Sequence, residues 1–220
     1  LTDCLSPYCK ISSAIGNYYS FGIKSDCTLW AWGCGFEGVL GNSCQSNQIS
    51  PIQIPGTWIC TCSYDYTVGQ RTDGTLWTWG NLSSGQSGTG SNISRSSPVQ
   101  VFGLSYKHFF ITSSSVMAIK EDGTLWAWGT NYSGELGTNN TIHRSSPVQI
   151  PGNWNCLREF GIAEKEGNVF TWGENNVYQL GIGNAANQSS PVMLGDKFQS
   201  YSKAAAHTLA QCKLTKEYNK

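Results

Sequence analysis

The chain has 220 residues, enough for one ordinary domain with a hydrophobic core or for a short array of repeats. Its 14 basic and 14 acidic residues balance, which removes the broad attraction to phosphate behind non-specific nucleic-acid binding. We therefore expect no nucleic acid among its partners. Nine Trp, ten Tyr and eight Phe offer too much apolar surface for a disordered chain. No stretch approaches the roughly 20 apolar residues of a membrane-spanning helix, so we expect no membrane insertion.

Along the chain, an aromatic tetrapeptide returns four times. It reads Trp-x-Trp-Gly in three copies and Phe-x-Trp-Gly in the fourth, with steps of 47, 49 and 44 residues. Its aromatic residues are Trp30, Trp32, Trp77, Trp79, Trp126, Trp128, Phe170 and Trp172. A Ser-Pro marker follows each copy and keeps the same three steps. Two independent markers in one register establish a repeat of about 47 residues.

The two markers divide the chain into successive units. We expect an N-terminal segment, four full repeats and a C-terminal half-repeat, with these limits: 1–10, 11–54, 55–102, 103–150, 151–194 and 195–220. A half-repeat leaves strand edges that need partners. The segment 1–10 could complete the last unit, the ring could close with only four or five units, or a neighbouring molecule could supply strands. We expect closure within the chain.

Each unit is predicted to contain two hairpins. In the third unit, an alternating segment at 107–120 precedes the turn Glu121–Gly123 and a strand that ends at Trp128. After a glycine-rich connection, Pro147 opens a short strand, where proline costs no ladder hydrogen bond. No segment has a helical period, so the chain is predicted to be all-β.

Four short strands in 44–49 residues match the size of one propeller blade, and blades bury their faces by stacking on their neighbours. The aromatic residues of the first marker carry a large apolar area at a repeated position. We therefore predict that all eight form the core between blades. A ring of exposed Trp that stacks on sugars is the alternative.

The segment Asp122–Gly137 reads Asp-Gly-Thr-Leu-Trp-Ala-Trp-Gly-x-Asn-x-x-Gly-x-Leu-Gly, and His-Thr-Leu-Ala follows at 207–210. Both resemble the RCC1 repeat, and the resemblance extends from Ile11 to about Cys212. It implies an RCC1-like β-propeller, or a propeller-like array, of about four and a half four-stranded blades. The usual closed ring of that family has seven blades. The resemblance also implies a protein-binding module rather than an enzyme.

Nine cysteines are present: Cys4, Cys9, Cys27, Cys34, Cys44, Cys60, Cys62, Cys156 and Cys212. This number predicts some disulfide bonding in an oxidising compartment. Burial of several as small hydrophobic residues is one alternative, and a zinc site near the Cys60-Thr-Cys62 pair is another, although no C-x₂-C pair occurs. Because the total is odd, at least one thiol is unpaired within the chain.

Asn-x-Ser/Thr sequences offer candidate N-glycosylation sites in the loops after the Trp-Gly markers. They begin at Asn81, Asn92, Asn131, Asn139 and Asn187. Their shared position would place glycans on one edge of the array. With the cysteines, they favour a secreted glycoprotein in an extracellular or virion-surface setting.

Motifs that carry chemistry are missing. The sequence has no HExxH, no GxSxG and no glycine-rich loop followed by Lys-Ser/Thr. His108 and His207 fall at comparable places in their repeats, where other repeats carry Tyr or Ser, and His143 lies in a loop. We expect no enzyme, with no catalytic residue, metal or cofactor.

The expected function is a structural or binding platform for protein–protein interaction or self-assembly. One alternative is a carbohydrate-binding lectin, with amides at equivalent loop positions such as Asn131 and Asn175–Asn176. The other is an intracellular regulator like the best-known member of the RCC1 family, a nucleotide-exchange factor for a small GTPase. Disulfide bonds would exclude that regulator, whereas free thiols would favour it.

Overall fold

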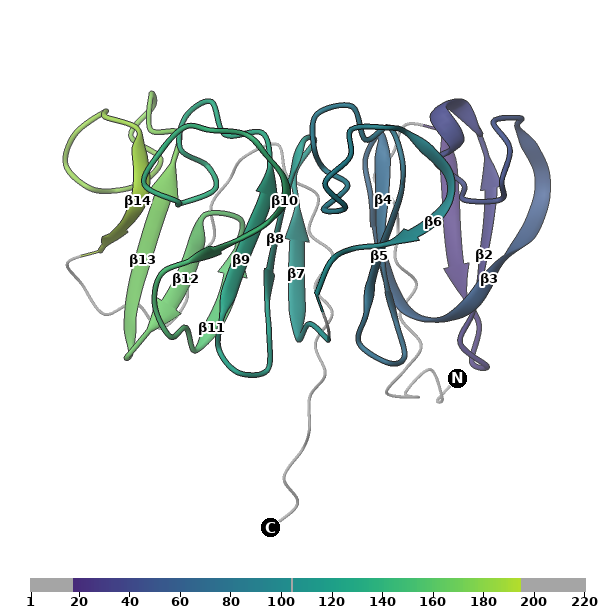
Figure 1. Cartoon of the computed structure of the whole chain (residues 1–220), viewed down its shortest axis with the longest axis horizontal. Helices are drawn as coiled ribbons and strands as arrows, with labels where there is room; N and C mark the ends of the chain where they lie inside the picture. The colour runs from purple at the N-terminus through teal and green to yellow at the C-terminus, as the bar shows by residue number, and fades with distance from the viewer. Residues whose placement is uncertain (1–17, 104, 195–220) are drawn as a thin grey trace, which may run out of the picture.

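The structure is a computed structural model and describes residues 18–103 and 105–194. Within these ranges the chain forms antiparallel sheets that stand side by side (Figure 1). A three-residue 3-10 helix, η1 (Phe36–Gly38), is the one helix of the described residues, which contain no helix able to cross a membrane. The prediction of an all-β, RCC1-like array of four-stranded blades is confirmed.

Four blades are described, and each sheet follows the order of its strands along the chain. Blade 1 consists of β1 (Tyr19–Ile23), β2 (Thr28–Gly33) and the first half of β3 (Gln48–Ser63). Blade 2 consists of the second half of β3, β4 (Tyr66–Arg71), β5 (Leu76–Gly80) and β6 (Arg95–Gln100). Blade 3 consists of β7 (His108–Ile111), β8 (Ser115–Ile119), β9 (Leu125–Gly129) and β10 (Arg144–Ile150). Blade 4 consists of β11 (Cys156–Glu159), β12 (Ile162–Lys165), β13 (Asn168–Gly173) and β14 (Gln188–Met193).

The strands of all the sheets end on two opposite sides of the array, at the top and bottom of Figure 1. The long connections β2–β3, β5–β6, β9–β10 and β13–β14 all lie at the top, and we call this side the loop edge. The tight turns β1–β2, β4–β5, β8–β9 and β12–β13 lie at the bottom, and we call it the turn edge. The predicted segments 1–10 and 195–220, and with them ring closure, lie outside the described residues.

A chain of hydrogen bonds builds the turns at the turn edge. In blade 3, Asp122 Oδ1 accepts hydrogen bonds from the backbone N–H and the hydroxyl of Thr124, at 2.9 and 2.7 Å. These two bonds hold the pKa of Asp122 below its usual value. The Thr124 hydroxyl accepts a bond from Trp126 Nε1 at 2.9 Å, and the Lys120 ammonium lies 4.4 Å from the indole ring. The first aromatic residue of the marker is thereby fixed near the turn edge.

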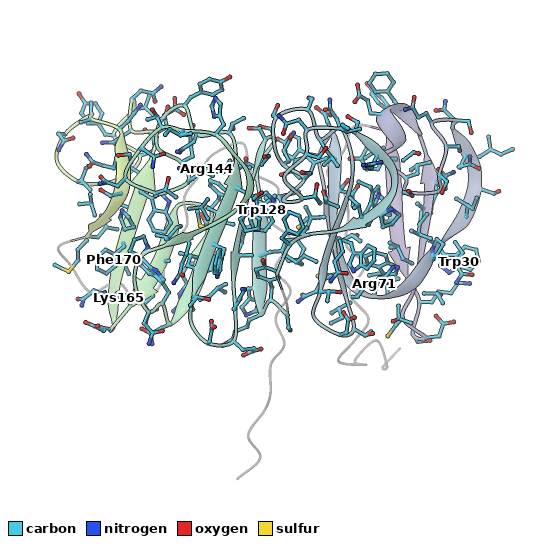
Figure 2. The ribbon with its side chains drawn as sticks, viewed as in Figure 1. Trp30, Arg71, Trp128, Arg144, Lys165 and Phe170 are labelled. Atoms are coloured by element: carbon cyan, nitrogen blue, oxygen red, sulfur yellow. The ribbon has the colours of Figure 1, made fainter. Side chains whose placement is uncertain are left out.

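Blades 1 and 2 repeat this arrangement. The corresponding Asp-Thr-Trp sets are Asp26, Thr28, Trp30 and Asp73, Thr75, Trp77. Lys24 and Arg71 lie over the two indole rings, at 3.8 and 3.6 Å from the ring centroids. Figure 2 shows Trp30 and Arg71 towards the turn edge.

The second Trp of the last three markers fills the core between two blades. Trp79, Trp128 and Trp172 have no exposed surface. Each donates its indole N–H to a backbone carbonyl of the preceding blade, and the acceptors are Val39 at 2.7 Å, Gln86 at 3.0 Å and Glu135 at 3.0 Å. Trp128 is therefore more buried than Trp30 or Arg71, which are both half-buried. Burial of these rings, with their polar atoms paired, accounts for how the blades adhere.

The prediction that all eight marker residues form the inter-blade core was therefore too broad. Trp77, Trp126 and Phe170 are half-buried and pack against the margins of the three cores. Trp30 and Trp32 are also half-buried, and they lie outside these cores. Within the described residues no blade precedes β1, so Trp32 has no neighbour of the kind that covers Trp79.

A glycine of the preceding blade makes room for each buried Trp. Gly41, Gly88 and Gly137 have positive φ angles, and a Cβ atom on them would stand 2.8, 2.9 and 2.7 Å from the indole nitrogens of Trp79, Trp128 and Trp172. A side chain at these positions would collide with the ring. The glycines of the repeat therefore set the spacing between blades.

Candidate functional site

The four connections at the loop edge are closed in the same way. In each, a backbone N–H near the start donates to a side-chain acceptor twelve residues later. The donor and acceptor pairs are Gly35 to Asn47 Oδ1, Leu82 to Ser94 Oγ, Asn131 to His143 Nδ1 and Asn175 to Asn187 Oδ1, at 3.1, 3.2, 2.8 and 2.8 Å. His143 is thus a structural acceptor. We call each of these bonds a loop clasp.

The clasp at His143 gives a direct test of this interpretation. His143→Ala is expected to lower the free energy of unfolding by about 1–2 kcal/mol, because the Asn131 N–H loses its partner. His143→Asn, which places the residue used in blades 1 and 4, should restore most of that loss. Both variants remove the ring contact with Tyr132, so their difference isolates the hydrogen bond. Urea denaturation measures it, and equal losses would contradict the clasp.

Two asparagines behind the clasps are fully buried. The Asn131 amide donates to the carbonyls of Asn140 and Ile142, and its oxygen accepts from the Leu136 N–H. Asn175 forms the equivalent three bonds with Asn184, Ala186 and Leu180. The expectation that Asn131 and Asn175 bind sugar is wrong, because their polar atoms already hold the loops together. The same burial and hydrogen bonds argue against a glycan on Asn131, whose glycosylation stays a prediction.

The other candidate glycosylation residues also lie at the loop edge. Asn92, Asn139 and Asn187 are exposed, whereas Asn81 is half-buried and accepts hydrogen bonds from the N–H and the hydroxyl of Ser83. Their position on one edge agrees with the sequence analysis. Glycosylation itself stays a prediction.

The predicted disulfide framework is borne out only in part. Cys27, Cys34 and Cys44 are free thiols, and no disulfide joins two cysteines of the described ranges. Cys60, in contrast, is disulfide-bonded. Cys60 and Cys62 are buried in β3, Cys156 begins β11, and Cys4, Cys9 and Cys212 lie outside the described residues. In the described part no group of three or more Cys, His, Asp or Glu could hold a metal ion. The argument for an oxidising compartment therefore loses its support from Cys27, Cys34 and Cys44 and keeps it from Cys60. The extracellular or virion-surface setting stays a prediction.

Large apolar side chains project from the loop edge. Tyr18, directly before β1, is 81% exposed, and Phe36 in η1 is 71% exposed. Tyr132 in the β9–β10 connection is 77% exposed, and Tyr178 in the β13–β14 connection is 68% exposed. Ile93 is exposed in the β5–β6 connection, Ile142 in the β9–β10 connection and Val177 in the β13–β14 connection. We call these seven residues the loop-edge apolar set. The sequence analysis missed them, although an aromatic residue a few positions after the Trp-Gly marker was a signal.

A pocket opens at the loop edge between blades 1 and 2. Its volume is about 250 Å³. It is lined by Tyr18, Tyr19, Cys34, Phe36, Glu37, Val39, Asp65 and Asn81. Tyr19 is fixed by its hydroxyl, which donates to the Tyr64 carbonyl and hydrogen-bonds to the Ser63 hydroxyl. Burial raises the pKa of Tyr19 to about 12, and the charge of Asp65 contributes to the shift.

Comparison with known families identifies the family to which these repeats belong. The profile of the regulator of chromosome condensation (RCC1) repeat matches residues 73–116, 122–156 and 166–211, more than half of the chain. The chain belongs to the RCC1 repeat family. No protein with a curated description matches the chain in sequence.

Solved structures of RCC1-family proteins share the fold. Human WBSCR16 is 21% identical, with a TM-score of 0.68 over 82% of this chain and 52% of its own. Prp20p from Saccharomyces cerevisiae, which was studied with its binding to Gsp1p and histones, is 18% identical, with a TM-score of 0.67 over 82% and 49%. Yeast RCC1 (Prp20) bound to Kap60 is 18% identical, with a TM-score of 0.68 over 84% and 49%. The RCC1-repeat chain spans about half the length of these structures.

Proposed function

We propose that this RCC1-repeat chain is a non-catalytic platform that binds protein partners through its loop edge. The observation that carries the proposal is the loop-edge apolar set, which stands on connections held by clasps above rigid sheets. Exposed apolar side chains gathered on one face favour a protein interface. Loops positioned by a stiff scaffold are a common place for binding residues.

The electrostatics of the described residues also suit binding better than catalysis. The carboxylates with lowered pKa values are Asp26, Asp73 and Asp122, and each is occupied in holding its turn. Burial raises the pKa of Tyr66, whose hydroxyl bridges blades 2 and 3 by donating to the carbonyls of Thr112 and Ser115. These shifts thus accompany structural roles, whereas catalytic groups need shifts matched to a reaction.

The test compares two surfaces of the whole chain. A triple variant, Tyr132→Ser, Val177→Ser and Tyr178→Asn, removes apolar surface from the loop edge of blades 3 and 4. Asn suits position 178 because its φ is 63°. A control variant, Phe102→Ser and Met193→Ser, removes exposed apolar surface beside β6 and β14. Proteins cross-linked to each form are then quantified by mass spectrometry.

The expected result is that the proteins captured by the unchanged chain are lost by the triple variant and kept by the control. Urea denaturation would confirm that both variants fold. Equal capture by the unchanged chain and the folded triple variant would reject the loop edge as the binding surface.

An intracellular regulator of RCC1 type is the second candidate. The free thiols of Cys27, Cys34 and Cys44 favour a reducing compartment, whereas the disulfide bond of Cys60 favours an oxidising one. Binding of Gsp1p and histones is known for Prp20p, so these two proteins are suitable probes for this chain. Stoichiometric binding of either would support this candidate. A glycosylated, disulfide-bonded chain in mass spectrometry would instead support the extracellular setting, and a mass that rises with concentration would support self-assembly.

A further inference from the structure

The pocket between blades 1 and 2 combines aromatic walls with negative charge. Tyr18 and Phe36 are exposed at its mouth, and the half-buried ring of Tyr19 lines it. Glu37 of η1 and Asp65 of the β3–β4 connection supply a carboxylate from each blade. No Lys, Arg or His belongs to the lining.

Neither carboxylate is neutralised within the described residues. The ion pair present there joins Arg158 to Glu164, in blade 4. The negative potential of Glu37 and Asp65 is therefore available to a ligand. Because one side of the pocket is open to solvent, a charged group could enter without leaving water completely.

The size of the pocket limits its ligand. A volume of about 250 Å³ lies below the roughly 300–1,000 Å³ of pockets for drug-sized ligands and cofactors. It suits the end of one long side chain. A metal ion fits less well, because Cys34, Glu37 and Asp65 do not form a group that could hold a metal.

We propose that this pocket binds a cationic side chain, the ammonium group of a lysine, presented by a basic segment of the protein partner. Aromatic rings attract cations through the negative charge of their faces, and two carboxylates strengthen that attraction at the same place. This inference rests on the proposed function and names the chemistry of the partner at one point of the loop edge.

The experiment uses the whole chain and a defined probe, a short fluorescent peptide of alternating lysine and serine. The comparison peptide has the same sequence with every lysine acetylated, which removes the charge. Binding is measured by fluorescence anisotropy. The pocket variant is Glu37→Gln with Asp65→Asn. The control is Glu121→Gln with Glu166→Gln, which loses the same charge from exposed residues at the turn edge.

The lysine peptide should bind the unchanged chain, and the acetylated peptide should not. The pocket variant should weaken binding about tenfold or more, whereas the control should keep it within about twofold. Added salt should weaken the interaction, since the pocket is open to solvent. Equal loss in the two variants, or no binding of the lysine peptide, would overturn the proposal.

Failure here and failure of the proposed function are distinguishable. Tyr132, Val177 and Tyr178, which test the binding platform, do not line the pocket. If the pocket variant keeps the partners that the loop-edge triple variant loses, the proposed binding platform is supported and the proposed lysine-binding pocket is rejected.

Discussion

Trp128→Ala should lower the free energy of unfolding by about 3–5 kcal/mol, the range for truncating a large aromatic residue in a core. The ring fills the core between blades 2 and 3 without exposed surface, and its N–H pairs with the Gln86 carbonyl. Trp126→Ala, in the same strand, should cost about 1–2 kcal/mol because this ring is only half-buried. Urea denaturation followed by circular dichroism measures both values.

Trp128→Phe separates the hydrogen bond from the burial of the ring. It should cost about 1–3 kcal/mol, because the Gln86 carbonyl stays buried without its donor. If Trp126→Ala lowered the free energy of unfolding as much as Trp128→Ala, the difference in burial between the two rings would not affect stability. The account of how the blades adhere would then be wrong.

Gly137→Ala should destabilise the chain by about 2–4 kcal/mol through two effects. Its φ of +68° is costly for any residue with a Cβ atom, by about 1 kcal/mol. In addition, the new Cβ atom would stand 2.7 Å from Trp172 Nε1, and overpacking of this kind costs about 1–3 kcal/mol. The indole would have to move and would weaken its bond to the Glu135 carbonyl.

Gly183→Ala is the matched control for this change. Gly183 has a φ of +77° but no atom within 4 Å of the position of its Cβ, so alanine there meets only the backbone cost. The difference in unfolding free energy between the two variants therefore measures the collision with Trp172. Equal unfolding free energies for the two variants would show that the added Cβ atom at position 137 is accommodated without loss of stability. That result would contradict tight packing of Gly137 against Trp172.

The sequence predicted the fold class well because the repeat signals are local. Turn residues such as Asp122 and Gly123, the alternating strands and the doubled marker all act within a few positions. Depth was harder to predict. Trp126 and Trp128 are two residues apart in one strand, so they point to the same face. The alternation along a strand predicts the face of the sheet on which a side chain lies. Which of the two rings is fully buried depends on how the neighbouring blade packs against that face.

The loop edge was less predictable, since its contacts cross twelve residues and use different chemical groups. The clasps accept through Asn47, Ser94, His143 and Asn187, so no single residue type marks the position. The cysteines were only partly predictable, for another reason. Their number suggested cross-links, but pairing depends on distances that a count does not contain.

Strand β3 gives the first two blades a connection unlike the others. Its 16 residues pair with β2 along one half and with β4 along the other, so one unbroken strand belongs to both sheets. Loops join the later blades instead. The two halves meet at Gly56, whose φ is 116° and where the register with β2 shifts, so the strand turns from one sheet into the next without a loop. The two walls of the pocket are therefore joined directly by one strand. This short connection limits how far they can move apart, so a guest would spend less binding energy on reorganising its host.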